Sequence, residues 1–317
     1  MRMKNRRLNL SVTRTAPPPI ATSICAVVVT FFPDQAINDR IKILLRQVGL
    51  LIIIDNTPEK DVTERFTKLQ AEFGNTIDLI KNPINMGVST ALNQGLQRAL
   101  KLGFTWILTL DQDTNCNPDM IRTLLNVYDR CDVKPSVIGS NYYDPQSKKL
   151  KVAQHGEDTF LVQKTVITSG SLVDAVLARD IGGFRDDYFI DQLDHEFCLR
   201  VRAHGGRVVI SRSAVMQHSV GRLGGVRVPW TIFVLPDHPP IRKYYIARNT
   251  VTTIAAYWLQ EPMWCVRRGL RLLLGALSML LFETQGFIKV TAFVCGITDG
   301  IRGEMGPCRY GWLYRVS

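Results

Sequence analysis

The chain has 317 residues, of which 46% are hydrophobic and 21% charged, enough for one large α/β domain with an appendage. Its seven cysteines are an odd number and include no C-x-x-C pair, so the sequence indicates neither a disulfide framework nor a zinc site and fits a reducing, cytosolic environment. The net charge of +11 comes from the two ends, because 1–20 carries five Lys/Arg and no acid, and 242–317 carries ten Lys/Arg against four Asp/Glu.

These basic ends predict an anionic partner outside the neutral body of the chain. The basic C-terminal residues alternate with apolar runs and form no groove-reading motif, so we expect an anionic membrane surface and no nucleic acid. We divide the chain into a basic disordered arm (1–20), a central α/β domain (21–239) and a helical, basic and apolar C-terminal segment (240–317). The arm has no signal-peptide character, because its apolar run Leu8–Ser11 is too short. It is either a solvated tail or a segment drawn to a membrane.

The first half of the chain alternates predicted strands with predicted helices. Three continuous apolar runs read as strands buried on both faces, Ile24–Phe32, Leu50–Ile54 and Trp106–Leu110. The segments Ile37–Val48 and Met86–Lys101 have helical periodicity. This order predicts a mainly parallel, Rossmann-like sheet, with ligands bound at the carboxyl ends of the strands.

The second half is less regular. We expect a strand within Val166–Val173, a short helix over Asp194–Ala203 and a strand at Val208–Ile210. A helix over Tyr244–Leu259 is predicted to end before Pro262.

Two further apolar runs, Leu272–Phe282 and Phe287–Ile297, are too short to span a bilayer, which takes about 18–20 residues. With Arg267, Arg268 and Arg271 ahead of them, they suit helices lying at a membrane interface. The alternative is that they pack against the domain.

Two carboxylates follow the third predicted strand. Asp111 and Asp113 are two residues apart and could share one hard divalent cation, Mg²⁺ or Mn²⁺, that neutralises a diphosphate leaving group. The alternative is a charge cluster at the start of the helix predicted near Pro118. His218 is a candidate third ligand or a diphosphate contact, although a lone His is more often structural.

Polar residues also close the second predicted strand and open the following helix. Asp55 could accept hydrogen bonds from a base or ribose, or it could form an Asx turn with Asn56. Asn85, two residues before Gly87, could cap the helix, whose first amides could hold a phosphate. Plain capping explains it equally well.

A third acidic cluster lies at 191–196. On one helix, Asp191 would share a face with Asp194 and with His195, and Glu196 would lie beside them. A sugar hydroxyl loses a proton as it attacks, so a general base must be within reach, and a carboxylate here could serve. Ion pairing with Arg200 and Arg202 is the alternative. Further on, Arg242 and Arg248 suit a diphosphate or an anionic carrier, or a basic interfacial helix.

Eight motifs occur in an order that is specific although each is loose. They are VVVTFFP near the start, IDN at 54–56, NxGxSxAxNQG at 85–95, LDQDT at 110–114, SGSL at 169–172, FIDQLDHEFCLR at 189–200, the histidine at 218 and RKYYIARN at 242–249. Together they resemble the family 2 glycosyltransferases of GT-A fold, and within these the bacterial rhamnosyltransferases. The NQG motif and DGIRG at 299–303 are similar to the rhamnosyltransferases that add the second sugar of a rhamnolipid.

The resemblance implies that 21–239 is the catalytic domain. It also implies a metal-dependent, inverting transfer of L-rhamnose from dTDP-L-rhamnose to a lipid-linked saccharide or glycolipid, in polysaccharide or rhamnolipid synthesis. The enzyme would lie peripherally on the cytoplasmic face of the bacterial inner membrane. Its oligomeric state and its acceptor stay open.

The resemblance also assigns roles to residues. Asp194 matches the catalytic base, but Leu193 precedes it where many relatives have Glu-Asp, so Asp191 and Glu196 are alternates. The implied donor-binding residues are Thr30, Asp55, Asn56, Asn85, Gly87, Asn93, Asp111, Gln112, Arg242 and Arg248. The implied acceptor-binding residues are Ser169, Gly170 and His195, and the implied metal ligands are Asp111, Asp113 and His218.

Three other functions are weighed against this one. A different nucleotide sugar, such as a UDP-hexose or a galactofuranosyl donor, would keep the chemistry. A catalytically inactive membrane-binding module of the same fold would keep only the architecture. A sugar-1-phosphate nucleotidyltransferase is disfavoured, because Thr30–Asp34 lacks the glycine-rich phosphate loop of that class.

Overall fold

A computed structural model describes residues 15–58, 60–154, 156, 158–219, 222–223 and 236–316. In this part of the chain, ten strands form one sheet in the order β3-β2-β1-β4-β9-β6-β10-β5, with β7 beside β6 and β8 beside β10. The strands are β1 (Ile24–Thr30), β2 (Leu50–Asp55), β3 (Ile77–Lys81), β4 (Trp106–Asp111), β5 (Asn115–Cys116), β6 (Val137–Asp144), β7 (Lys149–Leu150), β8 (Phe160–Val162), β9 (Ser171–Asp174) and β10 (Val208–Gln217). Two further short strands, β11 (Arg222–Leu223) and β12 (Pro236–Asp237), pair with each other.

The predicted parallel arrangement holds in the first half of the sheet. β3, β2, β1 and β4 are parallel neighbours, and β1 and β2 are buried along their whole length. Beyond β4 the sheet is mixed, because β9 runs antiparallel to both β4 and β6. The strand expected over Val166–Val173 is only Ser171–Asp174, since Gly170 adopts a φ of 76° and turns the chain just before it.

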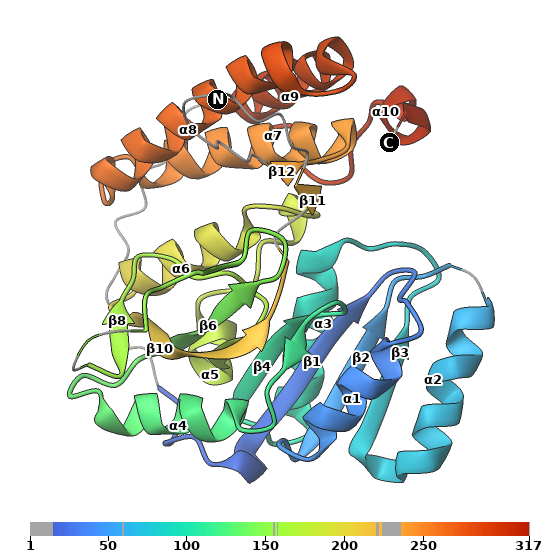
Figure 1. The fold of residues 1–317 in the computed structure, drawn as a ribbon, viewed down its shortest axis with the longest axis vertical. Coiled ribbons are helices and arrows are strands. Elements are labelled where there is room, and N and C mark those ends of the chain that lie inside the picture. The colour runs from blue at the N-terminus through green and yellow to red at the C-terminus, as the bar shows by residue number, and fades with distance from the viewer. Residues whose placement is uncertain are drawn as a thin grey trace.

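Helices cover both faces of the sheet (Figure 1). α1 (Ile37–Leu45), α2 (Lys60–Phe73) and α4 (Met120–Arg130) pack on one face. α3 (Val88–Lys101), α5 (Ala175–Asp180) and α6 (Leu193–Ala203) pack on the other. Short 3₁₀ turns lie at Ala21–Ser23, Gly74–Thr76 and Asp186–Tyr188.

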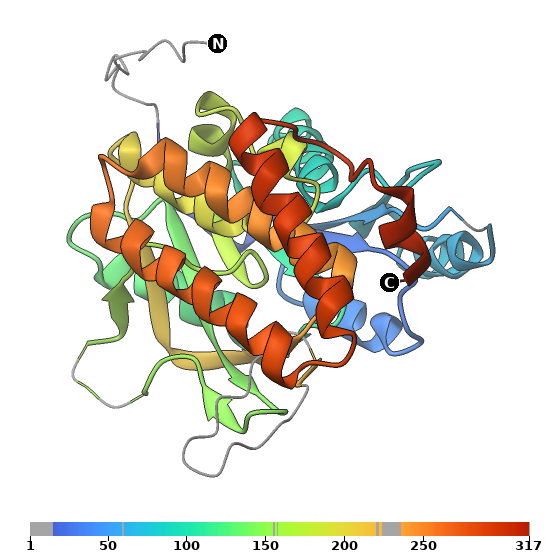
Figure 2. The same cartoon turned by 90° about the horizontal axis from the view of Figure 1, so that it is seen from above.

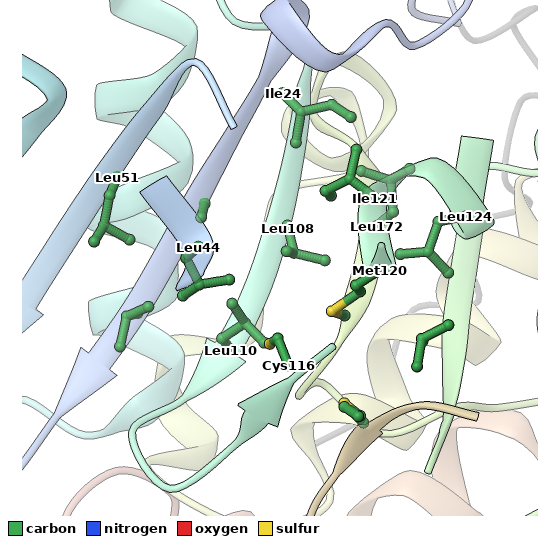
Figure 3. Close-up of a cluster of buried hydrophobic side chains, with 14 of the residues drawn as sticks. Ile24, Leu44, Leu51, Leu108, Leu110, Cys116, Met120, Ile121, Leu124 and Leu172 are labelled. Carbon is green, nitrogen blue, oxygen red and sulfur yellow. The ribbon is translucent and has the colours of Figure 1, made fainter. Parts of the chain in front are cut away.

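The alternation of side chains along each strand supplies a separate core on each face. Figure 3 shows the first core, where Leu108 and Leu110 of β4 meet Met120 and Leu124 of α4. The intervening residue Ile107 belongs to the core under α3, α5 and α6. The sheet is therefore buried between two helical layers, as the continuous apolar runs predict.

The expected disordered arm lies mostly outside the described residues, which begin at 15. The last part of that arm packs on the domain instead of extending from it. Ala16 is buried and donates its N–H to Asp174 Oδ2 at 2.9 Å, and the buried indole of Trp106 donates to the carbonyl of Pro17 at 2.8 Å. Because a buried indole N–H requires an acceptor, residues 16–17 are part of the folded body.

Three long helices form a layer above the sheet, and a short one follows (Figures 1 and 2). They are α7 (Pro240–Tyr257), α8 (Pro262–Phe282), α9 (Gly286–Arg302) and α10 (Gly311–Val316). α7 begins where the C-terminal segment is predicted to begin, and α8 is longer than the apolar run Leu272–Phe282. Gly296 lets α9 approach α7 closely, because a Cβ there would lie 2.3 Å from the carbonyl oxygen of Tyr244. Among the described helices, none combines the length and the apolar character that crossing a bilayer requires.

Candidate active site

The carboxyl ends of the strands open into a cavity of about 1540 Å³ that also extends under α7 and α8. Most of the residues predicted to form a site line it. They are Thr30, Asn56, Asn85, Gly87, Asp111, Gln112, Asp113, Ser169, Asp191, Asp194, His195, His218 and Arg242. Carboxylates from 111–113 and 191–194 thus share one cavity, as the sequence predicts.

Asp111, Asp113 and His218 form a cluster that could hold a metal ion, with one potential ligand atom of each lying within 4.8 Å of the others. His218 Nε2 lies 3.8 Å from Asp111 Oδ2, and Nδ1 lies 3.5 Å from Asp113 Oδ1. The pairing of β5 with β10 causes this meeting, because Asn115 is opposite Gln217 and the adjacent residue 218 therefore reaches the 111–113 loop. Desolvation in the cavity raises the pKa of Asp111, an effect that the interaction with His218 opposes and the carboxylate of Asp113 increases.

Neighbouring polar groups fix the loop that carries the two aspartates. The Asp111 N–H donates to Ser169 Oγ at 3.0 Å, and the hydroxyls of Ser169 and Thr114 lie 2.6 Å apart. Thr114 Oγ1 is also 3.1 Å from His218 Nδ1. Ser169, expected to bind the acceptor, therefore positions the metal-site loop.

Asp55 is fully buried and lies behind the cavity wall rather than in it. Its Oδ1 accepts hydrogen bonds from Thr30 Oγ1 and the Thr57 N–H, each at 3.0 Å, and its Oδ2 pairs with Lys81 at 2.9 Å. The Thr57 contact is the Asx turn proposed as the alternative reading. Asn56, the next residue, does line the cavity.

The turn before α3 contacts the loop that leads into α6. Asn85 Oδ1 accepts from the Gly87 N–H at 2.9 Å, so Asn85 forms a turn, and Gly87 is the residue that caps the helix. The first helical N–H, that of Val88, donates to the carbonyl of Phe189 at 2.6 Å. Gly87 has a φ of 82°, and a Cβ there would lie 2.7 Å from Phe189, so only glycine fits.

The 189–192 loop has an unusual backbone. Phe189, Asp191 and Gln192 have φ values of 60°, 65° and 64°. The Ile190 N–H donates to the Tyr188 carbonyl at 2.7 Å, which makes Phe189 the centre of a strained γ-turn. Strained backbone of this kind clusters at functional sites. Helix α6 begins only at Leu193, so Asp191 precedes the helix and does not share its face with Asp194.

The three candidate bases have different partners. Asp191 makes a two-pronged ion pair with Arg242, at 2.6 and 3.1 Å. Glu196 is buried outside the cavity wall and accepts hydrogen bonds from Arg200 at 3.1 and 2.9 Å and from Tyr257 at 2.9 Å. Within the described part of the chain, Asp194 accepts only the N–H of its neighbour His195, at 2.8 Å. Asp194 is therefore the carboxylate left available to a ligand.

Four other predicted site residues lie where the cavity does not reach. Arg248 is fully buried and donates to the carbonyl oxygens of Gly306, Asp187 and Tyr188 at 2.6, 3.1 and 3.3 Å. Asn93 exchanges hydrogen bonds with the backbone of Phe184, at 2.7 Å in both directions.

The other two predicted site residues outside the cavity are Gly170, which packs against Met216, and Glu196, which is described above. Arg248 and Asn93 support the loops around the cavity, because their buried polar groups bond to the backbone of those loops.

His195 lines the cavity and lies next to Asp194. Its Nδ1 is 2.8 Å from Thr165 Oγ1, and its ring meets that of Trp264 edge to face. Burial lowers the pKa of His195 to about 4, and the carboxylate of Asp194 offsets this only in part. The imidazole is therefore neutral near pH 7 and can exchange hydrogen bonds with a polar ligand.

The sequence analysis did not assign Lys151, Arg268 or Arg271 to the site, but all three line the cavity. The signal for two of them is spacing, since Arg268 and Arg271 are three residues apart on one helix and share a side of it. Lys151 carries no such signal, because it follows the short strand β7 and reaches the site through the tertiary fold.

The chain is similar in sequence to known glycosyltransferases. A family model described as Glycosyl transferase family 2 matches residues 25–215. The dTDP-rhamnosyl transferase RfbF of Shigella flexneri is 25% identical over 307 residues, which are 91% of this chain and 99% of that protein.

Two solved structures are similar in fold. The S. aureus TarS fragment 1–349 aligns with a TM-score of 0.59 at 13% identity, covering 89% of this chain and 81% of that one. GalNAc-T7, solved with UDP, GalNAc and Mn²⁺, aligns with a TM-score of 0.58 at 9% identity, covering 89% of this chain and 56% of that one. Together these comparisons confirm the expected GT-A type of α/β fold.

Proposed function

Because the chain belongs to glycosyl transferase family 2, we propose that it transfers L-rhamnose from dTDP-L-rhamnose, with inversion, to a hydroxyl of a lipid-linked saccharide or glycolipid. The rhamnosyl donor is supported by the similarity to RfbF along nearly the whole chain. The observation that carries the proposal is that the unpaired carboxylate of Asp194 shares a cavity with the cluster of Asp111, Asp113 and His218.

The residues of this cluster fit a divalent cation. Two carboxylates and one imidazole suit Mn²⁺, and they suit Mg²⁺ less well because that ion prefers oxygen ligands. When bound, such an ion supplies Lewis-acid stabilisation to the diphosphate leaving group. Ser169 and Thr114 hold the loop so that the two aspartates keep their separation.

The transfer is a single displacement. The acceptor hydroxyl oxygen forms a bond to the anomeric carbon while the bond from that carbon to the diphosphate oxygen breaks. The hydroxyl proton passes to Asp194, and the electron pair of the broken bond leaves with dTDP. Asp194 is suited to this because no ion pair within the described residues holds its carboxylate.

A panel of nucleotide sugars tests the donor. Purified protein with Mn²⁺ is incubated with dTDP-L-rhamnose, UDP-hexoses and UDP-galactofuranose, and release of the nucleotide diphosphate is measured. We expect turnover with dTDP-L-rhamnose and its loss after chelation. A UDP-sugar is the specific rival, because a TarS structure of similar fold (TM-score 0.52) was solved with UDP-GlcNAc. Turnover of a UDP-sugar alone would show that the donor is that UDP-sugar and not dTDP-L-rhamnose. If the protein bound no nucleotide sugar, it would be a catalytically inactive module of the same fold.

We further propose that the protein lies peripherally on the cytoplasmic face of the inner membrane. This proposal is supported by large apolar side chains that are exposed on α8 and α9, and by the exposed basic residue Arg267 of α8. They are Leu270, Leu273, Leu274, Leu277, Leu280, Leu281, Phe287, Val294 and Ile301. Sedimentation with phosphatidylglycerol vesicles should capture the protein, and a Leu273→Glu, Leu277→Glu variant should stay in solution. Equal sedimentation of both proteins would contradict the proposal.

A further inference from the structure

One wall of the cavity carries positive charges that the chain does not neutralise. Lys151, Arg268 and Arg271 line this wall. Arg268 donates to the uncharged amide oxygen of Gln192 at 2.7 and 3.1 Å. The side chains of Lys151 and Arg271 make no hydrogen bond or ion pair within the residues that the structure describes. The unpaired carboxylate near them is that of Asp194, so the wall keeps a surplus of positive charge.

These cations are close enough to affect one another. Lys151 and Arg271 are exposed to solvent. Partial desolvation lowers the pKa of Lys151, and the positive charges of Arg271 and Arg268 lower it further, while Asp194 opposes the change. Like charges held close together at a cavity wall repel each other. An anion bound between them offsets this repulsion, so the wall favours anion binding. Guanidinium groups pair with phosphate oxygens through two parallel N–H donors.

From this wall the cavity continues between the helices of the C-terminal layer. Part of its lining there is apolar, with Ile246 of α7, Leu272 and Met279 of α8, and Phe293 of α9. The ion-paired side chains of Lys243, Glu283 and Lys289 also line this part of the cavity. Gly275 of α8 also lines it, and a Cβ added at Gly275 would meet no atom within 4 Å. The passage is therefore open beside this glycine, and on the same helix lie the exposed leucines described above.

We propose that Lys151, Arg268 and Arg271 bind a phosphate or diphosphate group on the acceptor, and that its hydrocarbon chain runs between α7 and α8 past Gly275. This deepens the proposed function by naming the acceptor as a saccharide linked through phosphate to a long apolar chain. Because Asp194 lines the same cavity as Lys151 and Arg268, the attacked hydroxyl and the phosphate would belong to one acceptor molecule in that cavity.

Direct binding tests the charged wall without any need for turnover. The probe is farnesyl diphosphate, which joins a diphosphate to an apolar chain, and its Kd is measured by calorimetry. Lys151→Gln and Arg271→Gln should each raise this Kd about tenfold, the loss of one charge-assisted hydrogen bond. Arg267→Gln is the matched control, since Arg267 is exposed on the same helix outside the cavity lining, and it should bind like the parent.

Chain length tests the passage. Isopentenyl diphosphate has the same head as farnesyl diphosphate but a chain too short to pass Gly275. Gly275→Leu should weaken farnesyl diphosphate at least tenfold and leave isopentenyl diphosphate unchanged. Leucine is the better helix former by about 1 kcal/mol, so the variant should fold.

Four results would overturn the proposal. Farnesol has the same apolar chain as farnesyl diphosphate but no phosphate. If the Lys151 and Arg271 variants weakened farnesol binding by the same factor, the wall would not recognise the phosphate. Displacement of farnesyl diphosphate by dTDP in competition would assign the wall to the donor. If these variants bound phosphatidylglycerol vesicles more weakly but kept the Kd for farnesyl diphosphate, the charged wall would instead bind lipid headgroups of the bilayer. An unchanged Kd in every variant would leave no anion site. Failure of the donor panel is a separate result, because no nucleotide sugar is used here.

Discussion

Three carboxylates lie within six residues, and their partners separate them. Asp191 is held by Arg242 and Glu196 by Arg200 and Tyr257, while Asp194 faces the cavity. The sequence could predict that this cluster lies at the site, because its place in the order of motifs and the strand ends that carry the other motifs indicate one shared site. The resemblance favours Asp194 and leaves Asp191 and Glu196 as alternates. The sequence could not separate the three by their partners, since Arg242 and Tyr257 lie 51 and 61 residues beyond the acids that they contact.

The first prediction concerns the base. Asp194→Asn should lower kcat by about 10²–10⁴-fold and leave the Kd for the nucleotide sugar nearly unchanged, because the proton transfer occurs only in the transition state. Pre-steady-state transfer and equilibrium donor binding measure the two quantities. Glu196→Gln is the comparison, and it should mainly lower stability. A Glu196→Gln variant that folds normally but is as inactive as Asp194→Asn would reassign the base.

The second prediction concerns His195. Its pKa is about 4 in the folded protein against an ordinary value of 6.5, with burial as the main cause, then Arg268, Lys151 and Arg271 against the opposing Asp194. The unfolded chain therefore binds more protons between these values, and the free energy of unfolding should fall as the pH drops from 6.5 toward 4. Urea denaturation at pH 7 and pH 5 should show a smaller loss for His195→Asn than for the parent. Identical losses would contradict this.

At the scale of elements, α7 holds the loop that precedes Asp194. The Asn249 side-chain amide lies 2.9 Å from the carbonyl oxygens of Tyr188, Ile190 and Asp191, and Arg248 holds Asp187 and Tyr188. Hydrophobic periodicity predicts that α7 is a helix. It does not predict that two polar residues of the RKYYIARN motif point at backbone carbonyls, because those carbonyls belong to a loop about sixty residues earlier in the sequence.

The third prediction follows from that support. Arg248→Lys keeps the charge but not the planar fork, so at least two of the three buried hydrogen bonds from this side chain are lost and the free energy of unfolding should fall by about 3 kcal/mol. Transfer activity should fall with it, because the 189–192 loop loosens. Chemical denaturation and kcat measure both. Arg302→Lys, at an exposed position near the end of α9, is the control and should change neither quantity. Full activity of the Arg248→Lys enzyme would show that activity does not depend on the support of this loop by α7.

At the scale of the whole molecule, the sequence predicts the sheet, its two helical faces and the C-terminal boundary near 240, because buried parallel strands and amphipathic helices have distinct periodicities. It does not predict how the C-terminal layer covers the cavity. That depends on close approach at small residues, and glycines such as Gly296 and Gly275 look alike in sequence although one touches a backbone and the other lines an open passage.

The fourth prediction tests the joining of α7 to α9. Gly296→Val would place atoms inside contact distance of the Tyr244 carbonyl, so the helices must separate and the free energy of unfolding should fall by about 1–3 kcal/mol. The KM for the acceptor should rise more than the KM for the donor, because the acceptor is proposed to lie under this layer. Gly303→Ala, just beyond α9, is a control for helix-end strain and should alter stability without altering the ratio of the two KM values. Equal changes in both KM values for Gly296→Val would contradict the prediction.

Phe189 touches both halves of the molecule. Its carbonyl accepts from the first N–H of α3, and its ring stacks on Tyr245 of α7 at 5.3 Å. In the proposed arrangement, Phe189 would lie between the donor and the acceptor. If bound nucleotide changes the affinity for a lipid acceptor beneath α7 by some factor, the bound lipid must change the affinity for the nucleotide by the same factor.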